Sequence, residues 1–144
     1  MIDELKEMWK KDSAIDPTRV VDMVVGVPNL HSKYVELLST ARLKYRKIES
    51  DMYRLRRTKI RYYRGEMGKD ELDHYEWRQW QGPKPLKTDL EELLSTDEDL
   101  LTKGDQLEYY RVAMEMLEMI MKSIHARGWD LKTIVDAQKW LSGS

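Results

Sequence analysis

The sequence has no cysteine, no phenylalanine and no long apolar run. Without cysteine the chain has neither a disulfide framework nor a thiolate metal site, which fits a reducing cytoplasm. No apolar stretch approaches the roughly 20 residues that a membrane-spanning helix needs. The first twelve residues mix acidic and basic side chains, so they lack the apolar core of a signal peptide. Tyrosine, tryptophan and methionine must provide the large packing side chains.

Sequence patterns typical of enzyme sites are missing as well. The chain has no GxxxxGK[ST] phosphate loop and no GxGxxG motif after a strand. Its three histidines, His31, His74 and His125, are far apart in the sequence, and none is paired at metal-ligand spacing. Asp70, Glu71 and His74 could at most form a metal-dependent nuclease site, and we interpret His74 as a surface histidine among charges. We therefore predict no enzyme, no catalytic residue, no metal and no cofactor.

The size and composition predict one domain with a thin core. The chain has 144 residues, of which 35% are charged and 41% hydrophobic. These proportions are typical of helical bundles and coiled coils rather than of thick globular folds. We predict an all-α fold, with one long helix and several shorter ones.

Apolar spacing predicts three helices in the first half of the chain. Residues 3–11 form a short amphipathic helix, and Asp16-Pro17 is a good start for a valine-rich second one. A strand is the alternative for the valine-rich segment, because valine favours strands. We expect its valines to be buried, with an interface between subunits as one possible place. Pro28-Asn29 predicts a break, after which apolar steps of three and four continue from Leu30 to Tyr62 as one long helix.

The second half is expected to be more divided. Residues 65–85, bounded by glycines and prolines, read as a loop or mobile arm that contains a short helix and whose tryptophans pack on the body or stack on a base. Asp105 opens a further helix that Gly128 closes in a left-handed conformation, and Asp130 caps a final helix over residues 131–141. The domain is thus expected to divide into residues 1–64, 65–85 and an assembly part, 86–144.

The most distinctive feature is a basic run between Arg42 and Arg64. It contains ten Lys or Arg residues against Glu49 and Asp51 only, although the whole chain has a net charge of −1. Tyrosines interleave with the cations, and this combination is typical of proteins that hold single-stranded nucleic acid. The predicted DNA-binding residues are Lys44, Arg46, Lys47, Arg54, Arg56, Arg57, Lys59, Arg61, Tyr62, Tyr63 and Arg64.

Two other readings of the basic run remain open. A charge run on a helix is often only a solvated face. Alternatively, the run meets the acidic residues 89–108, which hold eight Asp or Glu and one Lys, in a partner or a neighbouring subunit. In that second case the protein is a helical structural or assembly protein.

Three segments together resemble the UvsY-type recombination mediators of T-even-like phages. Residues 57–65, RTKIRYYRG, resemble the family motif of basic, any, basic, two residues, Tyr-Tyr, any, Gly. The IDPT of residues 15–18 and the KSIHARGWDLKTIVDA of residues 122–137 resemble its start and end. Arg61 departs from the motif, because an acidic residue often stands there, and residues 65–85 match poorly.

The resemblance implies a non-enzymatic, helical protein that assembles into ring-like homo-oligomers, hexamers or heptamers. Such proteins act in DNA recombination, repair and replication in the cytoplasm of the infected bacterial host. They bind single-stranded DNA and help load the phage strand-exchange recombinase onto strands covered by the phage single-strand-binding protein. The two basic motif positions, Arg57 and Lys59, take the DNA-binding role by resemblance. The C-terminal helix takes the assembly role, with Leu131, Ile134, Val135, Gln138, Trp140 and Leu141.

Overall fold

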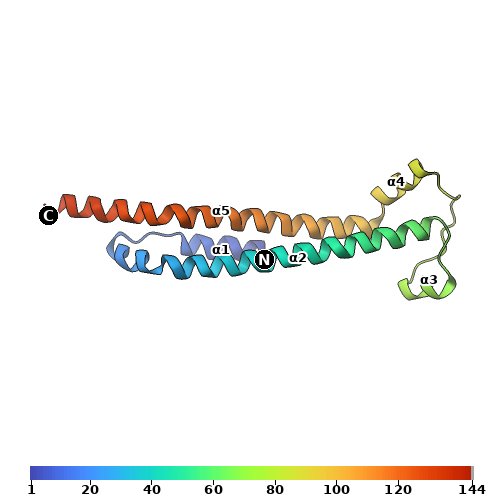
Figure 1. The fold of residues 1–144 in the computed structure, drawn as a ribbon, viewed down its shortest axis with the longest axis horizontal. Coiled ribbons are helices and arrows are strands. Elements are labelled where there is room, and N and C mark those ends of the chain that lie inside the picture. Colours follow the sequence, from blue (N-terminus) through green and yellow to red (C-terminus); the bar gives the residue numbers. More distant parts are fainter. Residues whose placement is uncertain (144) are drawn as a thin grey trace. The chain divides into compact units, whose positions relative to one another are not determined.

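The computed structural model describes residues 1–143, in which helices are joined by short non-helical segments and there is no strand (Figure 1). In chain order the elements are α1 (Ile2–Asp12), the 3-10 helix η1 (Pro17–Arg19), α2 (Val20–Tyr63), α3 (Lys69–Tyr75), α4 (Lys87–Ser95) and α5 (Glu98–Leu141). The predicted all-α class is confirmed. None of the described helices is both long enough and apolar enough to cross a membrane.

The chain divides into two compact units. The first combines Met1–Leu43 with the chain from Tyr110 onward, and the second is Lys44–Tyr109. These units follow contacts rather than chain order, and the predicted division at residues 64 and 85 stays a prediction.

The first unit packs α1 against the start of α2 and the later part of α5, which lie side by side (Figure 1). Its core consists of Leu5, Tyr34, Leu38, Ala41, Ala113, Leu117, Ile120 and Ile124. The buried Tyr34 meets Trp9 edge-on and donates a hydrogen bond of 2.8 Å to Asp12, which also pairs with Lys33. These contacts hold the end of α1 against α2.

α2 continues through Pro28, so the predicted break there is wrong. Proline lacks the N–H that would bond to the carbonyl of Val24, a loss that costs about 3 kcal/mol inside a helix. Val27 and Leu30, on either side of the proline, pack against the core of the first unit. We infer that this packing offsets the missing hydrogen bond and holds the helix together.

The valine-rich start of α2 is helical, and most of it is less buried than predicted. Val20 is buried, whereas Val21, Val24 and Val25 are exposed within the single chain. Their predicted burial between subunits stays a prediction.

α5 also continues where a break was predicted. It begins at Glu98 rather than Asp105 and passes through Gly128 in helical conformation, so the left-handed cap and the separate last helix are wrong. Arg127, just before the glycine, donates to the carbonyls of Ser13 and Ala14. Gln138, well after it, donates to the carbonyl of Pro17. Contacts on both sides of Gly128 therefore hold one continuous helix, which offsets the roughly 1 kcal/mol helix cost of a glycine.

The second unit contains the end of α2, α3, α4 and the start of α5. Its core consists of Tyr63, Leu90, Leu94 and Leu100, with Met52, Leu55, Ile60, Tyr62, Trp80 and Leu93 packed around them. Gly65, at a φ of 71°, ends α2 in the left-handed region, as expected for a C-terminal glycine. Asp97 accepts a hydrogen bond from the backbone N–H of Leu100 and so caps the start of α5.

Candidate nucleic-acid interface

One side of α2 in the second unit presents a straight row of exposed side chains, Arg46, Tyr53, Arg57 and Arg64, here called the outer row. At 100° per residue the four positions lie within about 40° of one another around the helix axis. Arg64 lies one residue beyond the end of α2, and its N–H still bonds to the carbonyl of Ile60 at 3.1 Å. The row covers five helical turns, or about 27 Å.

The outer row has unbalanced positive charge. Within residues 1–143, the side chains of Arg57 and Arg64 make no ion pair. Arg46 pairs with Glu49 three residues on, at 2.7 Å, and remains 73% exposed. Such exposed pairs contribute about 0–1 kcal/mol and are readily exchanged. Lys47 is also exposed and without an ion pair in the described chain, but it lies about 100° around the helix axis from Arg46.

Lys59 points away from the outer row, into the second unit. It is 6% exposed, and its ammonium pairs with Asp97 at 3.0 Å and Asp99 at 2.8 Å. The same ammonium lies 4.1 Å from the ring centroid of Trp77. This group of Lys59, Tyr63, Trp77, Asp97 and Asp99 is called the lysine cluster below. Its geometry disfavours the predicted direct contact between Lys59 and a phosphate.

The lysine cluster keeps Asp97 ionised. Burial raises the pKa of the Asp97 carboxyl, but hydrogen bonds from the Tyr63 hydroxyl, the Leu100 amide and Lys59 outweigh that effect and hold it below 3.8. The Tyr63 hydroxyl donates a hydrogen bond of 2.7 Å to Asp97. Burial is the largest cause that raises the pKa of the Tyr63 phenol, and the hydrogen bond to Asp97 is the second. A charged hydrogen bond in a partly dry setting is stronger than a surface pair. The cluster therefore joins α2, the segment after α3 and the start of α5.

The two motif tyrosines also face inward. Tyr62 donates to the carbonyl of Arg78 and meets Trp77 edge-on, with ring centroids 5.4 Å apart. Tyr63 is buried and meets Trp80 at 5.0 Å. The Trp80 ring lies so close to Gly82 that a β-carbon there would be 2.3 Å from it, so this turn requires glycine. Of the two readings of the tryptophans, packing on the body is the one that the structure shows.

The remaining cations of the basic run are partly paired within the chain. Arg56 pairs with Glu91 at 3.1 Å, and Arg61 pairs with Glu71 at 2.7 Å. The hydrogen bond from Arg61 is the largest cause that lowers the pKa of Glu71. Arg54 reaches Asp51 at 3.4 Å, and Lys44 is exposed but has an interaction partner. The acidic segment thus meets the basic run of its own chain and leaves the outer row open.

The predicted assembly residues divide between core and surface. Leu131 is fully buried, Ile134 and Val135 are half-buried, and Gln138 donates a hydrogen bond to the carbonyl of Pro17 in η1. Trp140 and Leu141 are 81% and 79% exposed at the end of α5. The end of α5 therefore presents two adjacent apolar side chains to water.

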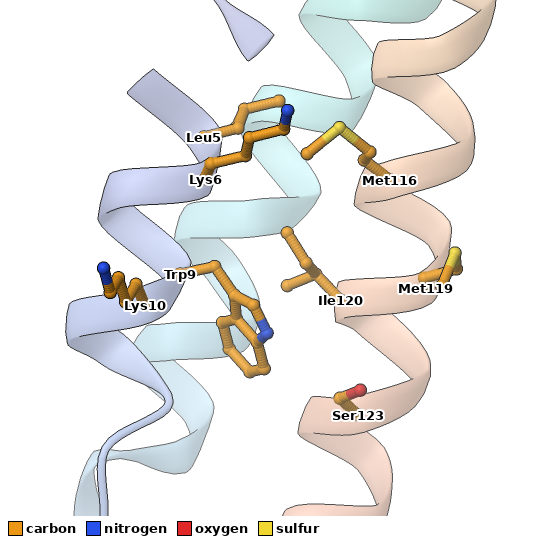
Figure 2. Close-up of a pocket in the computed structure, with 8 residues that line it drawn as sticks. All are labelled: Leu5, Lys6, Trp9, Lys10, Met116, Met119, Ile120 and Ser123. Carbon is orange, nitrogen blue, oxygen red and sulfur yellow. The ribbon is translucent and has the colours of Figure 1, made fainter. Parts of the chain in front are cut away.

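An apolar hollow of about 310 Å³ lies between α1 and α5 in the first unit. Figure 2 shows Trp9 and Ile120 pointing into the space between the two helices, with Met116 and Met119 on the side of α5. Its lining is mostly hydrocarbon, thioether and indole, so it offers packing contacts and no acid–base pair.

The acidic residues of α3 do not form a metal site. In the described part of the chain, no three His, Cys, Asp or Glu side chains lie close enough together to hold a metal ion. Glu71 is engaged with Arg61, and the His74 ring meets Tyr75 edge-on. The nuclease reading of Asp70, Glu71 and His74 therefore has no geometric support.

Residues 8–144 match the family described as "Recombination, repair and ssDNA binding protein UvsY". The chain belongs to the UvsY family. It is 26% identical over 144 residues to the recombination protein UvsY of Enterobacteria phage T4, covering 99% of this chain and 98% of that protein. Two crystal structures of the bacteriophage T4 recombination mediator protein UvsY share its fold. One has a TM-score of 0.83 at 23% identity, over 95% of this chain and 98% of that one. The other has a TM-score of 0.84 at 22% identity, and the match covers 99% of this chain and 98% of that one.

Membership of the UvsY family confirms the resemblance seen in the three sequence segments. The family is one of phage proteins for recombination, repair and binding of single-stranded DNA. The outer row combines open cations with an aromatic face, two features typical of surfaces that bind single-stranded nucleic acid. Sequence reasoning counted Tyr53 among the tyrosines that interleave with the cations, but its predicted DNA-binding residues included only Tyr62 and Tyr63. The seven-residue steps from Arg46 to Tyr53 and from Arg57 to Arg64 are the signal that identifies the row.

Proposed function

We propose that this protein is a recombination mediator that holds single-stranded DNA along the outer row and helps load the phage strand-exchange recombinase onto it. The carrying observation is the straight, exposed row of Arg46, Arg57 and Arg64 on one side of α2, with little acidic compensation. Each phosphate that an arginine neutralises releases counterions, so the binding is tight in dilute buffer and weakens with salt. Binding of this kind does not depend on sequence, which suits a mediator.

The protein works as a homo-oligomer, a ring of six or seven subunits, in this proposal. The exposed Trp140 and Leu141 at the end of α5 and the exposed valines of α2 supply apolar surface for subunit contacts. Several outer rows in one assembly then bind one strand together, and their weak contacts add through effective concentration. Partners in the cytoplasm of the infected bacterium are the phage recombinase and the phage single-strand-binding protein. The T4 relative is itself described as a recombination mediator.

A reconstituted strand-loading assay tests this function. Single-stranded DNA is first covered with the phage single-strand-binding protein, and ATP hydrolysis by the recombinase reports how quickly it occupies the strand. We expect addition of the protein to remove the delay. An Arg57→Gln, Arg64→Gln variant should be slower at moderate salt and closer to the wild type in dilute buffer. No acceleration by the wild type would contradict the proposal.

The second candidate is a structural or assembly protein that uses its basic run for protein contacts. The pairs Arg56–Glu91 and Lys59–Asp97 show that basic and acidic segments do meet, within one chain. This candidate predicts that the assembled protein ignores oligonucleotides at low salt, because its cations are covered. Filter binding at two salt concentrations separates the two functions.

A further inference from the structure

Tyr53 is the most exposed of the eight tyrosines. The residue is 60% exposed, and within residues 1–143 its side chain makes no ring contact and no hydrogen bond. It lies on the outer row, seven residues after Arg46 and four before Arg57. An open aromatic face between two arginines is the combination of features that binds an unpaired base together with its flanking phosphates.

We propose that Tyr53 is a base-stacking site that takes a nucleobase of single-stranded DNA while Arg57 and Arg46 hold the flanking phosphates. This site rests on the proposed function. It adds to that function a residue that favours single-stranded over double-stranded DNA. Bases in a duplex are stacked and paired, so turning a base onto the ring costs least for a single strand. Every base has a flat face, so the contact tolerates any sequence.

Three other tyrosines of the second unit are poorly suited to this task. Tyr62 and Tyr63 are held in the lysine cluster and its surroundings by their hydroxyl groups. Tyr75 is 41% exposed, but its ring is stacked on Trp77 with centroids 4.5 Å apart and an interplanar angle of 18°. Within the described chain, Tyr53 alone among the four combines a free ring with unpaired cations on the same side of its helix.

The competing explanation is that the Tyr53 ring packs against a second copy of the chain. The two explanations differ in what they predict for DNA that lacks bases. A stacking residue matters for normal oligonucleotides and is irrelevant for a strand of abasic sites with the same phosphates. A subunit contact affects both ligands equally, and it changes the assembly.

The experiment compares Tyr53→Leu, Tyr53→Phe and the control Tyr75→Leu with the wild type. Affinity is measured by fluorescence anisotropy for an oligothymidylate and for an abasic strand of equal length, and native mass spectrometry reports assembly. We expect Tyr53→Leu to lower affinity for the oligothymidylate by about five- to 150-fold, the range for one stacked base, with little change for the abasic strand. Tyr53→Phe should bind as the wild type does, because it keeps the ring, and so should Tyr75→Leu.

Three results would overturn the stacking site. They are equal losses of affinity on both strands, no loss with Tyr53→Leu, and a changed subunit number in that variant. Wild-type protein that binds both strands with the same affinity would refute stacking and leave electrostatic DNA binding intact. Wild-type protein that binds neither strand would refute the proposed function itself.

Discussion

Replacement of Lys59 by methionine separates a buried structural role from a DNA contact. The substitution keeps a long, flexible side chain and removes the charge that faces Asp97 and Asp99. Asp97 stays buried and retains its hydrogen bonds from Tyr63 and Leu100, whereas Asp99 is 53% exposed and can be solvated. Breaking a buried ion pair from one side costs about 3–5 kcal/mol. Because two hydrogen bonds to Asp97 survive, we expect the lower end, about 3 kcal/mol.

Urea unfolding followed by circular dichroism measures this loss, at one fixed protein concentration because assembly affects apparent stability. The matched control is Arg57→Met, two residues away on the outer row, where we expect a change within about 0.5 kcal/mol. DNA binding should show the opposite pattern, with an effect of Arg57→Met and none of Lys59→Met on its salt dependence. Arg57→Met lowers the slope of log affinity against log salt by about 0.7 for each phosphate that is no longer neutralised, whereas Lys59→Met leaves that slope unchanged. A stable Lys59→Met protein with a reduced salt slope would refute the inward placement of Lys59.

Three further predictions follow from the helices and the lysine cluster. Gly128→Ala should raise the free energy of unfolding by about 1 kcal/mol, because the residue is helical and open space surrounds its added β-carbon; a loss of stability would show a left-handed cap instead. Asp97 has a lowered folded pKa, so its contribution to stability is present above pH 3.8 and is lost as the pH falls through the folded value. As the pH is lowered through this range, the free energy of unfolding should therefore fall less steeply for Asp97→Asn than for the wild type. Parallel curves of that free energy against pH would contradict the lowered pKa of Asp97. Replacing Trp140 and Leu141 by serine should leave the helical content unchanged and reduce the subunit number in sedimentation velocity, and an unchanged assembly would refute their role.

Periodicity predicted the helical class, and together with Gly65 it predicted the C-terminal end of the long basic helix, but not its start at Val20. It failed at Pro28 and Gly128, because residues that weaken a helix locally were taken as its ends. Both helices continue because of contacts distant in sequence, such as those of Arg127 with Ser13 after α1 and of Gln138 with Pro17 in η1. These contacts are not readable from local spacing.

The basic run was recognised from its charge, but the direction of each side chain was not. Lys59 lies seven residues after Met52 and four before Tyr63, both of which belong to the packed side of α2. This spacing already places Lys59 on the inner side, opposite Arg57. Its acidic partners, Asp97 and Asp99, come from the start of α5, and their meeting with Lys59 depends on how the chain turns after Gly65. That tertiary step could not be predicted from the sequence.

The most direct test of the outer row is the salt dependence of single-stranded DNA binding by the wild type and by a variant with Arg46, Arg57 and Arg64 changed to glutamine. Each arginine that neutralises a phosphate contributes about 0.7 to the slope, so the triple change should flatten it by about 2 for one engaged row. Affinity in dilute buffer should fall, while helical content and assembly stay as in the wild type. Identical slopes for the two proteins would contradict the claim that this side of α2 holds the strand.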